Sequence, residues 1–257
     1  MINLRDTTFM IPLKVESEDR KKIIVLVVRY ILKHLDTNII ICEEGPNAIF
    51  PTLMDQSWGN RLTYIFRKND DNIFHKTKNL NIMAKRAKTP IIVSQDSDVI
   101  FYPHQYLSAA QLIRGNIVDF CYPFNKPNHR VLTKFHNQFA STLSLTGIEP
   151  YVSFDHHSPP PGGCFFMNKQ KFIDGGMENE NFMSWGPEDV ERRDRFIKLG
   201  YKIASSEGKL FHLEHSRTFN SDTTNPKFKH NEAEYKKIQG FSREQLRQYI
   251  GAWAWTK

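Results

Sequence analysis

The chain has 257 residues, of which 12% are aromatic and 25% charged, and its 35 Lys and Arg against 28 Asp and Glu give a net charge of +7. This aromatic content can fill a hydrophobic core, so the composition excludes a disordered chain. No apolar run approaches the ~20 residues that span a bilayer, because charged side chains interrupt even the longest run, at 23–35. The N-terminus also lacks a signal-peptide pattern. We therefore expect no integral membrane segment and a cytoplasmic protein, unless an anchor lies outside this sequence.

The positive net charge is compatible with nucleic acid, an anionic membrane surface or a phosphorylated substrate as partner. No basic run exceeds three residues and no nucleic-acid-binding motif is present, so we expect no nucleic-acid partner. A peripheral contact with a membrane stays open. Cys42, Cys121 and Cys164 are odd in number and lack metal-ligand spacing, which indicates three reduced thiols, with Cys42 and Cys121 in the core.

The first 125 residues alternate strand and helix signals. A run of β-formers at 7–11 ends at Pro12, and Ser17 is a plausible N-cap for a helix whose apolar residues recur at helical spacing as far as Leu35. Further strands are expected at 38–42, 62–66, 90–94 and 117–122, and further helices at 76–87 and 105–114. This alternation predicts an α/β fold with a mostly parallel central sheet, whose ligands bind at the carboxyl ends of the strands.

The second half of the chain is less regular. The pattern predicts a helix at 128–145, a strand at 164–167, a helix at 188–199 and terminal helices at 228–239 and 242–249. The Pro- and Gly-rich stretch 158–163 could be a domain boundary, but a strand resumes at once, which favours a loop. We expect one domain over 1–257, with a nucleotide- and metal-binding part at 7–125, an acceptor and catalytic part at 126–230 and a helical tail at 231–257.

Two aspartates, Asp96 and Asp98, flank a single residue directly after a predicted buried strand. Carboxylates on such a tight turn can bind a hard divalent cation, and the cation can in turn neutralise a diphosphate. The same two residues could instead form an Asx turn that caps the next element.

Glu188 and Asp189 lie at the start of a predicted helix, where the helix dipole favours ionised carboxylates. Trp185 and Gly186 come directly before them and offer a flat face and a close backbone approach, which suit a sugar ring. An exposed acidic pair at this position is also a common helix cap, so both interpretations stay open.

His212 and His215 are three residues apart, which places them on one face of a helix but not of a strand. Imidazole suits manganese or zinc better than magnesium. Two unconnected surface histidines would give the same pattern. His156 and His157, next to the Pro-rich stretch, are a further candidate pair.

These segments occur in an order that is found in a known family. The matching segments are, in chain order, 11–14 (Ile-Pro-Leu-Lys), 74–81, Asp96-Ser97-Asp98, 162–165 (Gly-Gly-Cys-Phe), 185–190 (Trp-Gly-Pro-Glu-Asp-Val), 212–217 (His-Leu-Glu-His-Ser-Arg) and 225–228 (Asn-Pro-Lys-Phe). Over residues 7–230 the chain resembles glycosyltransferases of the GT-A fold, specifically the β-1,4-galactosyltransferase family and its bacterial chondroitin-polymerase relatives. The resemblance implies a GT-A fold with a Rossmann-like central sheet flanked by helices.

The resemblance also implies roles for individual residues. Asp189 matches the catalytic base of the family and Glu188 the acid that orients the acceptor. Asp98 and His215 match ligands of a Mn²⁺ or Mg²⁺ ion, and His212 stands where the family has a methionine ligand. The donor and its nucleotide would be bound by Pro12, Lys14, Glu43, Phe74, Lys76, Asp96, Trp185 and Gly186.

The chain departs from the family pattern at four of these positions. Val190 replaces an acid and Pro187 a glycine. Lys14 and Lys76 replace arginines, which keeps the charge but loses the bidentate geometry of a guanidinium. The sequence shows no stem or anchor of the kind that Golgi members carry, which favours a bacterial or viral enzyme.

The implied activity is metal-dependent, inverting transfer of a hexose or N-acetylhexosamine from a UDP-sugar to a glycan acceptor, in surface polysaccharide synthesis. One alternative is a sugar nucleotidyltransferase, although the glycine-rich phosphate loop of that class is missing after the first strand. The other is a catalytically silent module that binds a glycan or a partner. Trp253 and Trp255 could form an acceptor platform or a packed tail.

Overall fold

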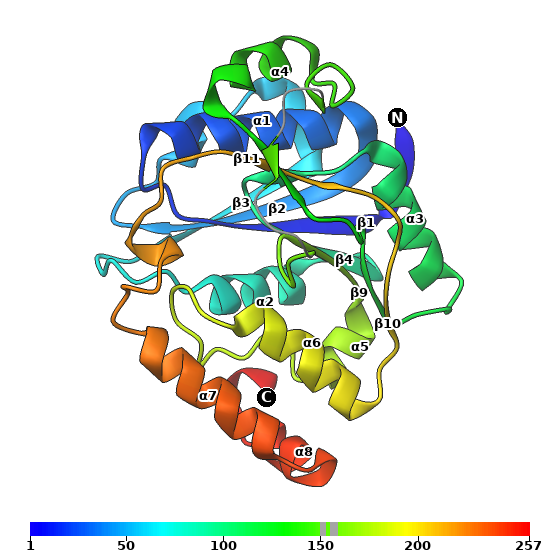
Figure 1. Ribbon diagram of the computed structural model, residues 1–257, viewed down its shortest axis with the longest axis vertical. Helices are drawn as coiled ribbons and strands as arrows, with labels where there is room; N and C mark the ends of the chain where they lie inside the picture. Colours follow the sequence, from blue (N-terminus) through cyan, green and yellow to red (C-terminus); the bar gives the residue numbers. More distant parts are fainter. Residues whose placement is uncertain (150–152, 155–158) are drawn as a thin grey trace.

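The computed structural model describes residues 1–149, 153–154 and 159–257. It contains a seven-stranded sheet in the order β10-β6-β9-β4-β1-β2-β3 (Figure 1). These strands are β1 (Ile2–Leu13), β2 (Leu35–Gly45), β3 (Leu62–Lys68), β4 (Ile91–Gln95), β6 (Phe120–Tyr122), β9 (Cys164–Asn168) and β10 (Ile203–Ser205). Paired strands run parallel, except that β9 is antiparallel to β4 and β6. The predicted α/β class with a mostly parallel sheet is confirmed.

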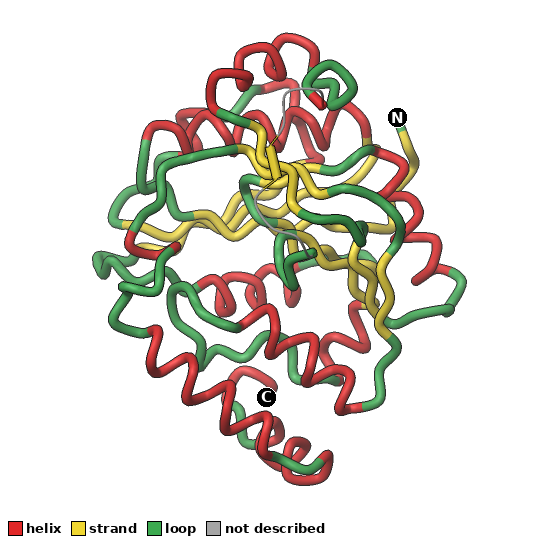
Figure 2. The backbone as a smooth tube through the Cα atoms, in the orientation of Figure 1, coloured by secondary structure: helices red, strands yellow, loops and turns green. Residues whose placement is uncertain are grey.

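A smaller sheet has four strands in the order β5-β11-β7-β8. They are β5 (Val99–Ile100), β11 (Leu210–Leu213), β7 (Asn128–Val131) and β8 (Ser153–Phe154). Figure 2 shows the strands of both sheets between an upper and a lower group of helices. Since β4 and β5 are separated only by residues 96–98, this short turn connects the two sheets.

Helices cover both faces of the large sheet. In Figure 1, α1 (Glu18–His34) and α4 (His136–Thr142) lie above it, and α2 (Lys76–Arg86), α5 (Lys169–Asp174) and α6 (Glu188–Leu199) lie below. The remaining α-helices are α3 (Pro103–Arg114), which packs against β1, β6 and β9, and α7 (Phe228–Gly240) and α8 (Arg243–Gly251), which pack against α6. Short 3-10 helices occur at Phe50–Leu53, Gln56–Arg61, Thr133–Phe135, Phe219–Ser221 and Ala254–Thr256.

The core forms where the predicted apolar faces meet. Ile24, Val27 and Ile31 of α1 are fully buried, as their helical spacing predicts. Phe9 of β1 contacts Tyr106 of α3 edge to face, with ring centroids 5.4 Å apart. All three cysteines are free and buried, so the expectation of reduced thiols is consistent with the structure.

The predicted helix at 128–145 is wrong. Residues Asn128–Val131 form β7, which pairs in parallel with β11, and only His136–Thr142 is α-helical before Leu143 ends the helix with a φ of 46°. Pairing with a strand that is distant in the sequence outweighs the local helical preference here.

Two strand predictions had the wrong bounds. Pro12 does not end the first strand, because β1 continues through Leu13 and keeps its register with β2, where Pro12 lies opposite Cys42. A proline removes only one ladder donor. The strand expected at 117–122 is limited to Phe120–Tyr122.

The C-terminal tryptophans form a packed tail rather than an acceptor platform. Trp253 is 4% exposed, and its ring stacks on Trp255 at 4.8 Å. The guanidinium of the buried Arg195 lies 5.3 Å from the ring of Trp253. Among the described residues, none of the helices has both the length and the apolar content that crossing a bilayer requires.

Candidate active site

Asp98, His212 and His215 form a group that we call the metal triad. Asp98 lies in the turn between β4 and β5, His212 lies in β11, and His215 follows that strand. The antiparallel pairing of β5 with β11 places Val99 opposite His212 and so brings the two segments together. The Nε2 atom of His215 lies 2.9 Å from Oδ2 of Asp98, and that of His212 lies 3.8 Å from the same oxygen.

The metal triad has the donor atoms of a transition-metal site. One carboxylate oxygen and two imidazole nitrogens lie within 4.8 Å of one another, and this set suits Mn²⁺ better than Mg²⁺. Burial opposes ionisation of Asp98, but the hydrogen bond with His215 and the positive charges around it lower its pKa well below the ordinary value. Asp98 therefore stays ionised, as a metal ligand must be.

Arg20, in the first turn of α1, is a further basic residue beside Asp98. Its Nη1 atom lies 3.9 Å from Oδ2 of Asp98, and its side chain is 15% exposed. The neighbouring Asp19 accepts hydrogen bonds from the backbone N–H and the hydroxyl of Ser216. These hydrogen bonds connect the first turn of α1 to Ser216, the residue that follows His215.

The second group, which we call the Lys76 cluster, consists of Lys76, Asp96, Glu188 and Asp189. The Nζ atom of Lys76 lies 3.2 Å from Asp96, 3.4 Å from Glu188 and 3.2 Å from Asp189. Lys76 begins α2, the two acids begin α6, and Asp96 belongs to the same turn as Asp98. The turn at 96–98 therefore belongs to both groups.

The carboxyl groups of the Lys76 cluster differ in acidity. Burial raises the pKa of Glu188 to about 7 and that of Asp96 to about 6, although the charge of Lys76 opposes both shifts. Burial also acts on Asp189, but the charges of Lys76 and Arg192 outweigh it and lower the pKa of Asp189. Asp189 is therefore ionised at neutral pH, which a general base has to be.

Arg192 fixes the carboxylate of Asp189 from the side opposite Lys76. Its Nη2 atom lies 2.8 Å from Oδ1 of Asp189, and its Nη1 atom lies 2.9 Å from Glu178. Gly162 approaches the same carboxylate so closely that a Cβ there would lie 2.3 Å from Oδ2 of Asp189. The absence of a side chain at Gly162 therefore makes room for this carboxylate.

The segment around Trp185 that leads into α6, which we call the Trp185 loop, is held by two asparagine side chains. The side-chain amides of Asn225 and Asn231 both donate to the backbone oxygen of Trp185. A Cβ on Gly186 would lie 2.6 Å from Asn231, so this close contact requires glycine. The ring of Trp185 is partly exposed and stacks on Phe228 at 5.5 Å, which gives a flat aromatic surface next to Glu188.

Three of the predicted nucleotide-binding residues, Pro12, Lys14 and Phe74, lie at the carboxyl end of β1 and before α2. The ammonium of Lys14 donates to the backbone oxygen of Asp71, which places it beside the segment that leads to Phe74. Asn220 connects this segment to the Trp185 loop, because its side-chain oxygen accepts from the N–H of Phe74 and from the hydroxyl of Ser184. Pro12 is buried in β1.

Glu43, at the end of β2, is bound to the loop that follows this strand. It is 1% exposed, and its carboxylate accepts hydrogen bonds from the N–H groups of Ile49 and Phe50 and from the hydroxyl of Tyr64. These contacts hold the loop after β2 and occupy both oxygens. Glu43 therefore holds this loop, and its contact with the nucleotide stays a prediction.

Sequence reasoning missed Arg20, Arg192 and Asn220. Arg20 had a usable signal, since a cation in the first helical turn lies at the unfavourable end of the helix dipole. Arg192 also had one, since it follows Asp189 by three residues on the same predicted helix, where such pairs are in contact. Asn220 is defined only by contacts between distant segments. His156 and His157 lie outside the described residues.

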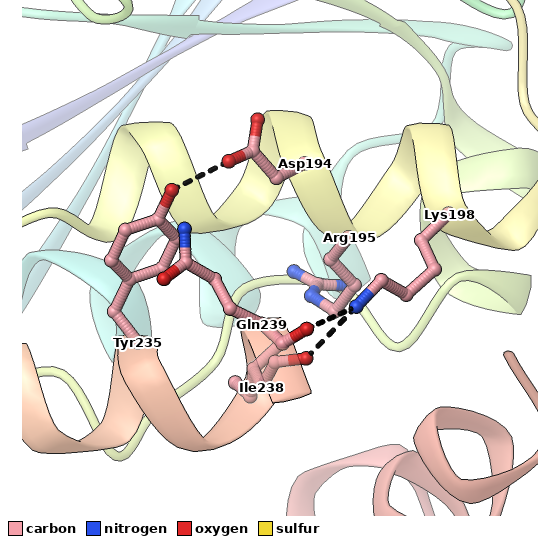
Figure 3. Close-up of a pocket in the computed structure, with 6 residues that line it drawn as sticks. All are labelled: Asp194, Arg195, Lys198, Tyr235, Ile238 and Gln239. Carbon is pink, nitrogen blue, oxygen red and sulfur yellow. Dashed lines mark hydrogen bonds between the residues drawn. The ribbon is translucent and has the colours of Figure 1, made fainter. Parts of the chain in front are cut away.

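A pocket of about 230 Å³ lies between α6 and α7, and none of the predicted site residues lines it (Figure 3). Its polar groups bind one another: Tyr235 donates to Asp194, and Lys198 donates to backbone oxygens of Ile238 and Gln239. The pocket is therefore part of the packing interface between α6 and α7.

One family model matches part of the chain. Residues 148–217 match the family model described as the N-terminal domain of galactosyltransferase. This segment includes Gly162, Glu188, Asp189, His212 and His215. Among curated proteins, no match to the chain is found.

The fold also matches a solved structure. The crystal structure of GalNAc-T7 with UDP, GalNAc and Mn²⁺ superposes with a TM-score of 0.61 at 12% sequence identity, over 90% of this chain and 47% of the other. The chain thus spans about half the length of that protein. The protein has the GT-A glycosyltransferase fold and resembles the galactosyltransferase family.

Proposed function

We propose that the protein is a metal-dependent, inverting glycosyltransferase that moves a hexose or N-acetylhexosamine from a UDP-sugar to a hydroxyl of a glycan. The observation that carries the proposal is the turn at 96–98, which places the metal triad beside the Lys76 cluster. A cation site and an ionised general base then lie on the two sides of one bound donor. The resemblance to polysaccharide-forming enzymes favours a role in surface polysaccharide synthesis.

Asp189 is the base in this mechanism. The acceptor hydroxyl oxygen forms a bond to the anomeric carbon of the donor sugar, and its proton passes to the carboxylate of Asp189. The bond between the anomeric carbon and the phosphate oxygen breaks on the opposite face, and its electron pair leaves with UDP. Arg192 keeps the Asp189 carboxylate oriented during this transfer.

Glu188 and Trp185 orient the acceptor. Since its pKa is raised to about 7, Glu188 can donate a hydrogen bond from its protonated form or accept one from an acceptor hydroxyl. The exposed ring of Trp185 offers an apolar face for a sugar ring, and Asn225 and Asn231 keep it in place.

The metal triad and Lys76 bind the diphosphate of the donor. Mn²⁺, or Mg²⁺ with lower preference, would be held by Asp98, His212 and His215, and when bound there it offsets the negative charge of the diphosphate. Lys14 and Phe74 lie at the edge of β1 and α2 where the nucleotide is expected. Asp96, in the same turn as Asp98, would lie against the ribose.

A thermal-shift panel of UDP-sugars, each with and without Mn²⁺, tests the donor assignment. A ligand that binds the folded state raises the melting temperature, so we expect a shift that needs both UDP-sugar and Mn²⁺. The donor with the largest shift is then used for transfer, and NMR of the product gives the anomeric configuration. Retention of configuration would contradict the inverting mechanism.

Two other outcomes of the panel favour the alternatives. Cooperative melting without a shift for any nucleotide would favour a silent binding module. Formation of a UDP-sugar from UTP and a sugar phosphate, without transfer to an acceptor, would favour a nucleotidyltransferase.

A further inference from the structure

Arg20 lies beside the metal triad, and among the described residues its charge is paired only through a long contact with Asp98. Its contact with Asp98, at 3.9 Å, is long for an ion pair, while His215 already binds the same oxygen at 2.9 Å. Within the part of the chain that the structure describes, its buried Nε atom has no hydrogen-bond partner. Since buried guanidinium groups normally have their donors satisfied, Arg20 has free donor capacity at this site.

The position of Arg20 in α1 is unfavourable unless an anion binds nearby. It lies in the first turn, where the helix dipole favours negative charge. Asp98 alone cannot balance Arg20 together with a divalent cation, and both imidazoles are neutral when they bind a metal. The neighbouring Asp96 is already paired with Lys76.

The excess positive charge matches a diphosphate. With a divalent cation on Asp98, the site carries one net positive charge, whereas a UDP-sugar carries one negative charge on each of its two phosphates. Since the charge of Lys76 is already balanced by Asp96 and Asp189, Arg20 supplies the second positive charge. When the bond to the sugar breaks, the departing UDP gains a further negative charge, and a guanidinium is suited to bind phosphate oxygens through two donors at once.

We propose that Arg20 binds the diphosphate of the sugar nucleotide next to the metal triad and stabilises UDP as it departs. This inference rests on the proposed function and adds a residue that the family pattern does not assign. Asp19 supports the role of its neighbour, because its hydrogen bonds to Ser216 fix the first turn of α1 relative to His215.

The competing role for Arg20 is to orient Asp98 as a metal ligand. The two roles predict opposite changes in metal affinity. If Arg20 orients Asp98, its loss weakens Mn²⁺ binding. If Arg20 binds phosphate, its loss removes a positive charge that repels Mn²⁺ and leaves the affinity for Mn²⁺ alone equal or higher.

The test is calorimetric titration of Arg20→Gln with three probes: Mn²⁺ alone, UDP with Mn²⁺, and UMP with Mn²⁺. We expect UDP to bind at least about tenfold more weakly than to the wild type, since a charge-assisted hydrogen bond is lost. UMP and Mn²⁺ alone should be unaffected or bind more tightly. Arg20→Lys should recover part of the UDP affinity, and Arg29→Gln, on an exposed position of the same helix, is the matched control.

Other outcomes would contradict either the role of Arg20 or the proposed function itself. Unchanged UDP affinity in Arg20→Gln, or a parallel loss of Mn²⁺ and UDP affinity, would overturn the inference while the proposed function stands. A wild-type protein that binds neither UDP nor Mn²⁺ would instead overturn the proposed function. Circular dichroism and melting of each variant show that the comparison is made on folded protein.

Discussion

The ammonium of Lys76 lies 3.2 Å from the carboxylate of Asp189, 113 residues further along the chain. This contact joins the start of α2 to the start of α6 and places a positive charge beside the proposed base. It lowers the pKa of Asp189 together with Arg192. The carboxylate is therefore ionised before the acceptor arrives.

Replacement of Asp189 by Asn should remove the proton acceptor and keep the shape of the side chain. A general base contributes about 10² to 10⁴ in rate, so we expect kcat to fall by at least about two decades. Binding of UDP with Mn²⁺ should persist. Steady-state kinetics and calorimetry measure the two quantities, and near-wild-type kcat would remove Asp189 from this role.

Replacement of Asp98 by Ala should abolish the binding of UDP that depends on Mn²⁺. Asp98 is the only carboxylate of the metal triad, and its loss leaves two imidazoles as ligands. Calorimetric titration of UDP in the presence and absence of Mn²⁺ checks this. The control is Asp70→Ala, because Asp70 is an exposed aspartate whose pairing with Lys68 is at the surface. Equal metal dependence in both variants contradicts the assignment.

Replacement of Gly162 by Ala should displace the Asp189 carboxylate. The added Cβ would lie 2.3 Å from Oδ2 of Asp189, so the carboxylate has to move. A displacement of ~1 Å can cost ~10² in rate, and we expect kcat to fall at least about tenfold with Mn²⁺ binding unchanged. Gly147→Ala is the matched control, because its nearest neighbour would be 3.9 Å away. Equal rates for the two variants would show that the base tolerates the contact.

Glu44 should make the stability of the protein depend on acid pH. Burial opposes its ionisation, but hydrogen bonds with His75, Asn79 and Asn69 outweigh it and lower its pKa from 4.5 to about 2. A group whose pKa is lower in the folded state stabilises the fold above its unfolded pKa, and this contribution is lost as the pH falls through the folded value.

The measurement is denaturant unfolding of wild type and Glu44→Gln between pH 7 and pH 2. The difference in free energy of unfolding should be constant above about pH 5 and should shrink as the pH falls from 4.5 to about 2. Glu18→Gln, on an exposed helix start, is the control. A difference that stays constant over the whole range would exclude the assigned role of Glu44.

The sequence predicts those parts of the fold that local patterns define. The apolar periodicity of α1 and the short buried strands around Ile92 are local properties, and they predict a parallel α/β sheet. The segment that became β7 shows the limit, because its conformation depends on pairing with Leu210 and its neighbours, which are about 80 residues away.

The candidate site likewise contains residues that local motifs identify and residues that only long-range contacts identify. Asp98, Asp189 and His215 belong to short motifs whose order along the chain identifies them. Arg20 does not, since it has a role only through contacts with distant elements. Arg192 belongs to no such motif either, although its contact with Asp189 is local to α6. Glu43 was assigned by its place at a strand end, and the structure shows that its hydrogen bonds go to the following loop.

The turn at 96–98 has a consequence for engineering the protein. Because Asp96 and Asp98 belong to the same three residues, a substitution that reshapes this turn alters cation affinity and base geometry together. His212 is the member of the metal triad that lies in a separate strand, β11. A variant library that aims to exchange one divalent cation for another, at constant acceptor chemistry, should therefore begin at His212 and leave the aspartates untouched.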